Sequence, residues 1–147
     1  MYGFYGKYNY GLDLKGRAQI PAQFRSLIPE DKPRIIVMTK GPDNCIHTFH
    51  PSVWREYIDR MSNLEMDKSE KLELMREVLA QTTNVNVDAQ FRFKVPTELA
   101  EYAMLKEDIE FIGFNDRIEI WNPDIRKEHR SKIKKIDRDK LLDVLIN

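Results

Sequence analysis

Hydrophobic and polar residues alternate in short runs along this chain, and turn-forming residues separate the runs. Tyr8, Tyr10 and Leu12 alternate with polar or small residues, which is the period-two pattern of a half-buried strand. The segment after them predicts a turn, a short strand and a helix, at 13–16, 17–20 and 21–28. A buried strand, a turn and a hairpin partner are then predicted, at 34–39, 41–44 and 45–49.

The same pattern returns later in the chain, which indicates an internal duplication. Residues 9–24 align with residues 84–99, and Asn, Asp, Arg and Pro recur at matching positions. Residues 45–51 align with residues 117–123, so the first copy is slightly longer. Two copies of one supersecondary unit are therefore expected to bury their apolar faces on each other.

Two helices are predicted between the copies. Ser52 is the expected N-cap of a helix at 53–61, and Asp67 is the expected N-cap of an amphipathic helix after it. The apolar side of this second helix predicts a core or subunit contact and comprises Leu72, Met75, Val78 and Leu79.

The C-terminal region is predicted to be basic and helical. Asp124 is expected to begin a helix that reaches about Lys135, and Asp137 to cap a last helix at 140–146. We therefore divide the chain into a first repeat, two linking helices, a second repeat and a basic helical tail, at 1–51, 52–82, 83–123 and 124–147.

The charge balance is neutral overall but uneven along the chain. The 147 residues include 24 Lys and Arg against 24 Asp and Glu, yet residues 1–60 carry a net +3 and the remainder −3. Residues 126–140 alone carry a net +5 and are expected to form either a solvated helix face or a non-specific phosphate contact. Such patterned charge can steer a polyanion to one face of a neutral protein.

The sequence also indicates the cellular compartment of the protein. No apolar run approaches the about 20 residues of a membrane-spanning helix, and the first residues lack the pattern of a signal peptide. Cys45 is the single cysteine, which agrees with a reducing compartment. We expect a soluble cytoplasmic protein with no membrane partner.

The sequence shows no assembled catalytic or metal-binding motif. Phosphate-binding glycine loops, a nucleophile elbow and a His-Glu-x-x-His motif are missing from the chain. Cys45 and His47 share one face of their predicted strand, His50 points away, and no second cluster is seen to supply a third ligand. His129 is expected to be solvated. We predict a protein that is not an enzyme and has no catalytic residue, metal, cofactor or small-molecule substrate.

The repeated Asp-x-x-x-Arg pattern places one charged pair on a predicted turn in each copy. Asp13 and Arg17 could form an exposed ion pair that only stabilises the hairpin slightly, by about 0–1 kcal/mol. The guanidinium also offers a planar fork suited to phosphate oxygens or to guanine. With nearby basic residues, Arg17 would form a ridge on the turn, made with Lys7, Lys15 and Arg25.

The segment 12–21, its second copy and the Glu-Ile-Trp ending at Trp121 resemble the MraZ family of bacterial transcriptional regulators, and the resemblance reaches from Met1 to about Ile133. It implies an α+β, mainly β fold, in which tandem AbrB/SpoVT-like swapped hairpins intertwine into one β-barrel with flanking helices. It also implies ring-shaped homo-oligomers that bind double-stranded DNA at direct-repeat promoter boxes. The expected role is repression of the protein's own division and cell-wall operon, in the cytoplasm at the nucleoid.

Carried over by position, the family's DNA-facing arginine falls on Arg17, with Lys15 beside it and Asp13 shaping the turn. The second motif supplies Asp88 and Arg92.

The second motif departs from the family pattern, because Phe91 stands where the family has glycine. A positive φ at Phe costs about 1 kcal/mol or more, so the second turn is predicted to adopt another geometry. Arg17→Ala is therefore expected to cost far more DNA affinity than Arg92→Ala.

Two alternative functions stay open at this stage. An antitoxin-like interaction module of the same fold would sequester a partner protein through the helical face at 72–79, and a small hydrolase or metal enzyme is the third class. Aromatic side chains near the N-terminus could stack on bases but are expected in the core or a subunit interface, namely Tyr2, Phe4, Tyr5, Tyr8 and Tyr10.

Overall fold

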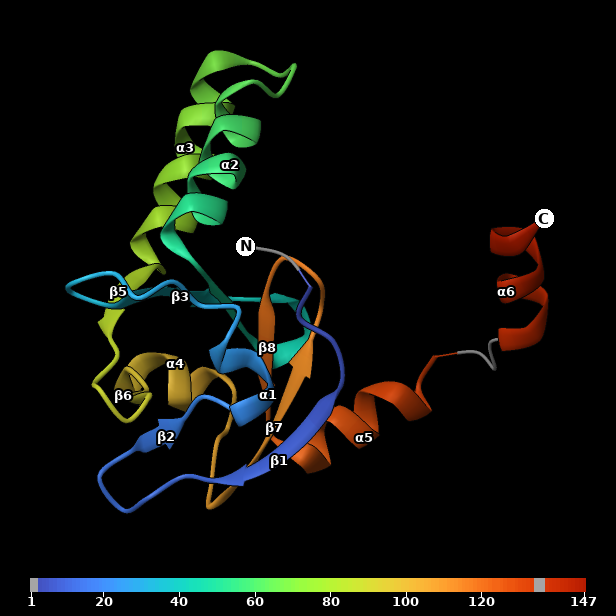
Figure 1. The fold of residues 1–147 in the computed structure, drawn as a ribbon. Coiled ribbons are helices and arrows are strands. Elements are labelled where there is room, and N and C mark those ends of the chain that lie inside the picture. The colour runs from blue at the N-terminus through green and yellow to red at the C-terminus, as the bar shows by residue number, and fades with distance from the viewer. Residues whose placement is uncertain (1–2, 134–136) are drawn as a thin grey trace.

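A computed structural model describes residues 3–133 and 137–147, so Tyr2 and the end of the predicted basic helix at 134–136 lie outside the described residues. The described chain is α+β (Figure 1). Its strands are β1 (Lys7–Gly11), β2 (Arg17–Gln19), β3 (Ile35–Lys40), β4 (Ile46–Phe49), β5 (Thr83–Asn86), β6 (Arg92–Lys94), β7 (Asp108–Gly113) and β8 (Ile118–Trp121). Its helices are α1 (Ala22–Arg25), η1 (Pro42–Asn44), α2 (Pro51–Ser62), α3 (Lys68–Ala80), α4 (Thr97–Tyr102), α5 (Pro123–Ser131) and α6 (Arg138–Ile146).

The order of strands in the main sheet interleaves the two predicted copies. Six antiparallel strands follow the order β1-β7-β8-β4-β3-β5. The first strand of each copy pairs with a strand of the other copy, β1 with β7 and β5 with β3. The last strands, β4 and β8, pair with each other at the centre. Exchanging the copies leaves this order unchanged, so the sheet has an approximate internal two-fold symmetry.

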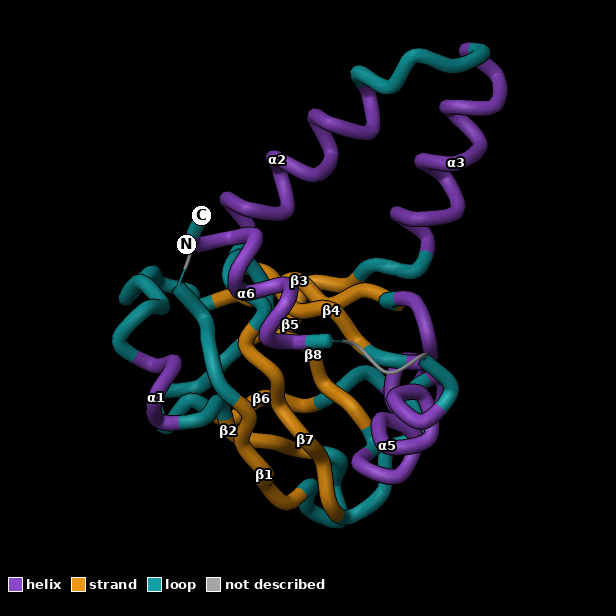
Figure 2. The backbone as a smooth tube through the Cα atoms, turned by 90° about the vertical axis from the view of Figure 1, so that its right-hand side faces the viewer, coloured by secondary structure: helices purple, strands orange, loops and turns teal. Residues whose placement is uncertain are grey.

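The predicted barrel is not confirmed by this pairing. Over the described residues the six-stranded sheet is open, with β1 at one edge and β5 at the other, and β2 pairs with β6 in a separate two-stranded sheet. Figure 2 shows the strands gathered below the two long helices. Local alternation predicted the strands, but closure depends on pairing between edges that are far apart in the sequence.

The core lies between the main sheet and the short elements that cover it. Its fully buried side chains come from both copies, and Phe24 makes edge-to-face contacts with Phe4 and Tyr8. Phe4, Tyr8 and Tyr10 thus pack in or against the core as expected, whereas Tyr5 is exposed.

Side chains cap the N-termini of the helices α2, α3 and α5, and the starts of two of these helices differ from the predictions. The predicted cap of α3 is confirmed, because the Asp67 carboxylate accepts from the N–H groups of its first turn. His50 rather than Ser52 caps α2, and α5 begins at Pro123, capped by Asn122, one residue before the predicted start at Asp124. In both helices Pro occupies the first helical position, where its missing N–H costs nothing.

Two helical segments extend away from the strands. α2 and α3 form a hairpin that stands clear of the sheet in both views, and α6 lies apart from the body in Figure 1. α3 buries none of its residues, so its apolar side is not part of this chain's own core. None of the described helices is both long and apolar enough to cross a membrane.

Candidate nucleic-acid interface

The strands β2 and β6 form a short antiparallel ribbon at the lower left of Figure 1. Its central residues, Ala18 and Phe93, oppose each other and are buried against the core. Because strand side chains alternate, their neighbours project from the outer face. This outer face is cationic and comprises Arg17, Gln19, Arg92 and Lys94.

The first turn holds Arg17 in place through Asp13. One oxygen of the Asp13 carboxylate accepts from the N–H groups of Lys15 and Arg17, at 2.9 and 2.8 Å. The other accepts from Nε of Arg17 at 2.8 Å. Gly16 closes the turn by donating to the Asp13 carbonyl, with a φ of +75° that glycine adopts without strain.

The second turn has the same hydrogen bonds, so the prediction that it adopts another geometry is wrong. The Asp88 carboxylate accepts from the N–H groups of Gln90 and Arg92 and from Nε of Arg92, at 2.9, 2.9 and 3.0 Å. Phe91 donates to the Asp88 carbonyl with a φ of +60°, where the first turn has Gly16.

Packing explains why Phe91 tolerates a left-handed backbone. Its ring packs against the core, and the Arg34 and Arg25 guanidinium groups lie 4.2 and 5.5 Å from its centre. Each such cation–π contact contributes about 0.5–1 kcal/mol, which is comparable to the strain of about 1–2 kcal/mol. The sequence showed the strain but not these two partners, which come from other segments.

Backbone hydrogen bonds join each turn to the other copy. The Gly16 carbonyl accepts from the Val95 N–H, and the Phe91 carbonyl accepts from the Ile20 N–H, both at 2.9 Å. The Gln19 amide donates to the Gln90 carbonyl at 2.6 Å. The two turns and the ribbon therefore form one unit with a fixed relative geometry.

The carboxylates orient both arginines without covering them. Arg17 and Arg92 each give their Nε–H to an aspartate, and their side chains remain 44% and 48% exposed. The terminal Nη groups of each guanidinium lie beyond this contact and can donate in parallel to a pair of acceptors, although Nη2 of Arg92 must first leave Oε1 of Gln90, to which it donates at 3.4 Å. Held by one side, each arginine also loses less conformational freedom when it binds a ligand.

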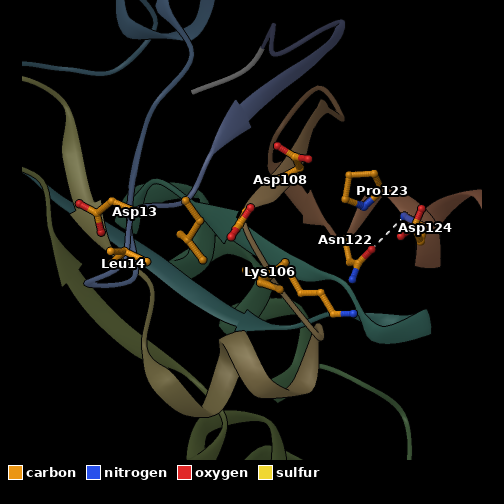
Figure 3. A pocket seen from close by; sticks show the side chains of 10 residues that line it. Asp13, Leu14, Lys106, Asp108, Asn122, Pro123 and Asp124 are labelled. Atoms are coloured by element: carbon orange, nitrogen blue, oxygen red, sulfur yellow. Dashed lines mark hydrogen bonds between the residues drawn. The ribbon is translucent and has the colours of Figure 1, made fainter.

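The surfaces on the two sides of the first turn differ in charge. One side is a groove of about 670 Å³ rich in carboxylates, where Asp13, Asp108 and Asp124 lie with Lys106 as its basic residue (Figure 3). The other side is a groove of about 690 Å³ in which three lysines outnumber one acid, Glu101; the lysines are Lys15, Lys94 and Lys106. A polyanion is repelled by the first groove and attracted by the second.

Sequence reasoning missed Lys94, although a signal was present. In the run Arg92-Phe93-Lys94 the cations alternate with an apolar residue, so a strand places both on one face. Each copy thus contributes two basic residues to the interface, Lys15 and Arg17 from the first and Arg92 and Lys94 from the second.

Two further sequence interpretations require correction. His129 is not solvated: its Nε2 lies 3.1 Å from an Asp43 carboxylate oxygen and its ring lies against Trp121. Cys45 and His47 do share a face, but the pairing of β4 with β8 brings Glu119 close to both as a third potential ligand. Asp43 and Glu119 are both far in the sequence from the residues they contact, so only the tertiary fold shows these contacts.

The turn aspartates should titrate at unusually low pH. The pKa of Asp13 and of Asp88 lies below the ordinary 3.8, chiefly because the backbone N–H of Arg17 or Arg92 donates to the charged carboxylate. The ionised carboxylates therefore stabilise the folded turns above the unfolded pKa, and this contribution is lost as the pH falls through the folded pKa.

Carboxyl-carbon NMR titration of the folded protein is expected to give midpoints below 3.8 for both. In Arg17→Ala the Asp13 midpoint should rise only partway, because the backbone donor remains, while that of Asp88 stays unchanged. An Asp13 midpoint at its ordinary value in the native protein contradicts the hydrogen-bonded turn.

Comparison with protein families gives a match over nearly the whole chain. The family model described as "MraZ protein, putative antitoxin-like" matches residues 4–76 and 78–142. The match includes both turns, the β2–β6 ribbon and the α2–α3 hairpin.

Several curated relatives are similar over most of their length. A protein named Transcriptional regulator MraZ from Caldanaerobacter subterraneus subsp. tengcongensis is 34% identical over 124 residues, which is 84% of each chain. A protein of the same name from Roseiflexus castenholzii is 34% identical over 120 residues, 82% of this chain and 81% of its own. Another from Clostridium tetani is 32% identical over 126 residues, 86% of each chain.

Proposed function

This chain belongs to the MraZ family, and we propose that it is a sequence-specific DNA-binding transcriptional regulator that contacts the duplex through the β2–β6 ribbon and its two turns. The observation that carries this proposal is the pair of identically built turns, each of which presents an arginine held at Nε by an aspartate. The name of the curated relatives supports the regulatory role.

The shape and charge of the ribbon suit the major groove of DNA. That groove admits a two-stranded β-ribbon, and an arginine fork that donates in parallel recognises the O6 and N7 acceptors of guanine. Arg17 and Arg92 are proposed to read bases in this way. Lys15 and Lys94 are proposed to contact phosphates, since an ammonium is a point charge without a planar fork.

The proposed mode of action is occupancy of a promoter by several copies. One ribbon neutralises few phosphates, so a single chain should bind weakly at physiological salt. A ring-shaped homo-oligomer on direct-repeat boxes would raise the effective concentration of each further ribbon. We propose that it represses its own division and cell-wall operon at the nucleoid. The intertwined barrel stays a prediction within this assembly. No catalytic step or cofactor enters this mechanism.

The direct test is a DNA titration over a series of salt concentrations. DNA from upstream of the protein's own gene is compared with a scrambled duplex of equal length and composition, while light scattering reports the mass of the complex. We expect affinity to fall steeply with salt for both duplexes, and the preference for the native sequence to persist at each salt. Equal affinity for the two duplexes contradicts sequence-specific regulation.

The helical hairpin favours a second candidate function. The family description includes the word antitoxin-like, and the α2–α3 hairpin carries exposed apolar side chains, Leu64, Met66, Leu72 and Leu79. In this alternative the hairpin sequesters a partner protein. A tight complex with another protein, together with equal affinity for the two duplexes, would favour it over the first function.

A further inference from the structure

Three potential metal ligands meet on the side of the sheet formed by β4 and β8. His47 and Glu119 are direct partners across these strands, and Cys45 immediately precedes β4. The thiol sulfur, one imidazole nitrogen and one carboxylate oxygen all lie within 4.8 Å of one another. None of these residues belongs to the β2–β6 ribbon or its turns.

We propose that Cys45, His47 and Glu119 form a binding site for a zinc-class divalent cation. Thiolate, imidazole and carboxylate are the three ligand types that Zn²⁺ takes in proteins, and three protein ligands leave a fourth tetrahedral position for water. This inference is independent of the proposed DNA binding.

The contact between His47 and Glu119 at the centre of this cluster is close but poorly aligned. Nε2 of His47 is buried and 3.2 Å from a Glu119 oxygen, yet it makes no hydrogen bond within the described residues. A buried nitrogen that faces a carboxylate without the alignment of a hydrogen bond keeps part of its desolvation cost. An ion between the imidazole and the carboxylate removes that cost.

Neighbouring groups orient the Glu119 carboxylate. Trp121 Nε1 donates to one of its oxygens at 3.1 Å, and Arg117 Nη2 donates to the other at 3.3 Å. Such donors fix the direction of a ligating carboxylate. Arg117 is itself paired with Asp116, which offsets part of its charge near the ion.

Gly41 allows the sulfur and the imidazole to approach each other. A Cβ at this position would lie 2.5 Å from Cδ2 of His47 and 2.8 Å from Sγ of Cys45. Any side chain here would push the two donors apart. Gly41 therefore leaves the space that Cys45 and His47 need.

Charge and proton balance are both met by the cluster. The thiolate and the carboxylate together neutralise a divalent ion. Without an ion the Cys45 thiol donates to the Pro42 carbonyl at 3.2 Å, and burial raises its pKa to about 12. Binding forms a metal–sulfur bond, breaks the S–H bond and releases the proton to the solvent.

Titration of the metal-free full chain with Co²⁺ tests the site. Cys45 is the single cysteine, so a thiolate-to-Co²⁺ charge-transfer band reports this site alone. We expect the band to saturate at one ion per chain and to disappear when Zn²⁺ is added. Absence of the band in folded protein overturns the proposal.

Matched variants separate ligation from folding. Cys45→Ser should abolish the band, and Glu119→Gln should weaken Co²⁺ binding by about tenfold or more. His50→Gln is the control, because this neighbouring histidine pairs with Asp31 and should leave the band unchanged. Circular dichroism confirms that each variant is folded. A band that persists in folded Cys45→Ser, or equal losses in His50→Gln and Glu119→Gln, contradicts the assignment.

Discussion

Replacing Arg17 with alanine is expected to weaken binding to the native promoter DNA by about 1–3 kcal/mol per contact, about 5- to 150-fold. The variant loses the Arg17 guanidinium, which Asp13 orients, and with it one cationic contact to DNA. The preference over a scrambled duplex should shrink together with the affinity. Because the backbone hydrogen bonds of the turn remain, the folded structure should persist.

Arg92→Ala is expected to cause a loss of similar size. The structure removes the reason for a large difference between the two arginines, because the second turn has the same hydrogen bonds and a similarly exposed guanidinium. If Phe91 had forced another geometry, the second arginine would not be presented in this way.

The control for both variants is Arg76→Ala on α3. Arg76 is also an exposed arginine paired with a nearby acid, Glu73, but it lies on the helical hairpin away from the ribbon. Fluorescence titration at fixed salt should show no change beyond about twofold for it. Equal losses of DNA affinity in Arg76→Ala and Arg17→Ala would show that affinity depends on the overall positive charge of the protein rather than on the ribbon.

Phe24→Ala is expected to lower the free energy of unfolding by about 3–5 kcal/mol. The Phe24 side chain is 1% exposed and packs edge-to-face against Phe4 and Tyr8. Alanine leaves a cavity among these rings, and both the transfer and the cavity contributions are lost. This is a large fraction of the stability of a typical domain.

Urea unfolding monitored by circular dichroism measures the Phe24→Ala effect. Leu14→Ala is the control, because Leu14 projects fully into solvent from the tip of the first turn and should change stability by less than about 0.5 kcal/mol. A loss below about 1 kcal/mol in Phe24→Ala would mean that the rings around it repack. The packing described for this part of the core would then be wrong.

Local patterns predicted most elements because strands and turns are encoded over a few neighbouring residues. The alternation at Tyr8 and Tyr10 appears as the half-buried strand β1, and the Asp67 cap starts α3 as expected. The helix predicted at 21–28 ends at Arg25, and the N–H groups of Leu27 and Ile28 then donate to carbonyls three residues back, those of Phe24 and Arg25, in the tighter pattern common at helix ends.

Prediction failed where a partner comes from a distant segment. The positive φ of Phe91 is compensated by Arg34 and Arg25, which lie against its ring and come from other segments. The third potential ligand beside Cys45 and His47 is Glu119, which the pairing of β8 with β4 brings close. In each case the missing information is a contact between residues tens of positions apart.

Residue types and their spacing were enough to predict the duplication, the two Asp-x-x-x-Arg turns and the family. The interleaving of the two copies, the shared geometry of both turns and the pairing of Lys94 with Arg17 emerge from the fold instead. The physical reason is that strand pairing between the copies is set by register over long sequence separations, which no local pattern specifies.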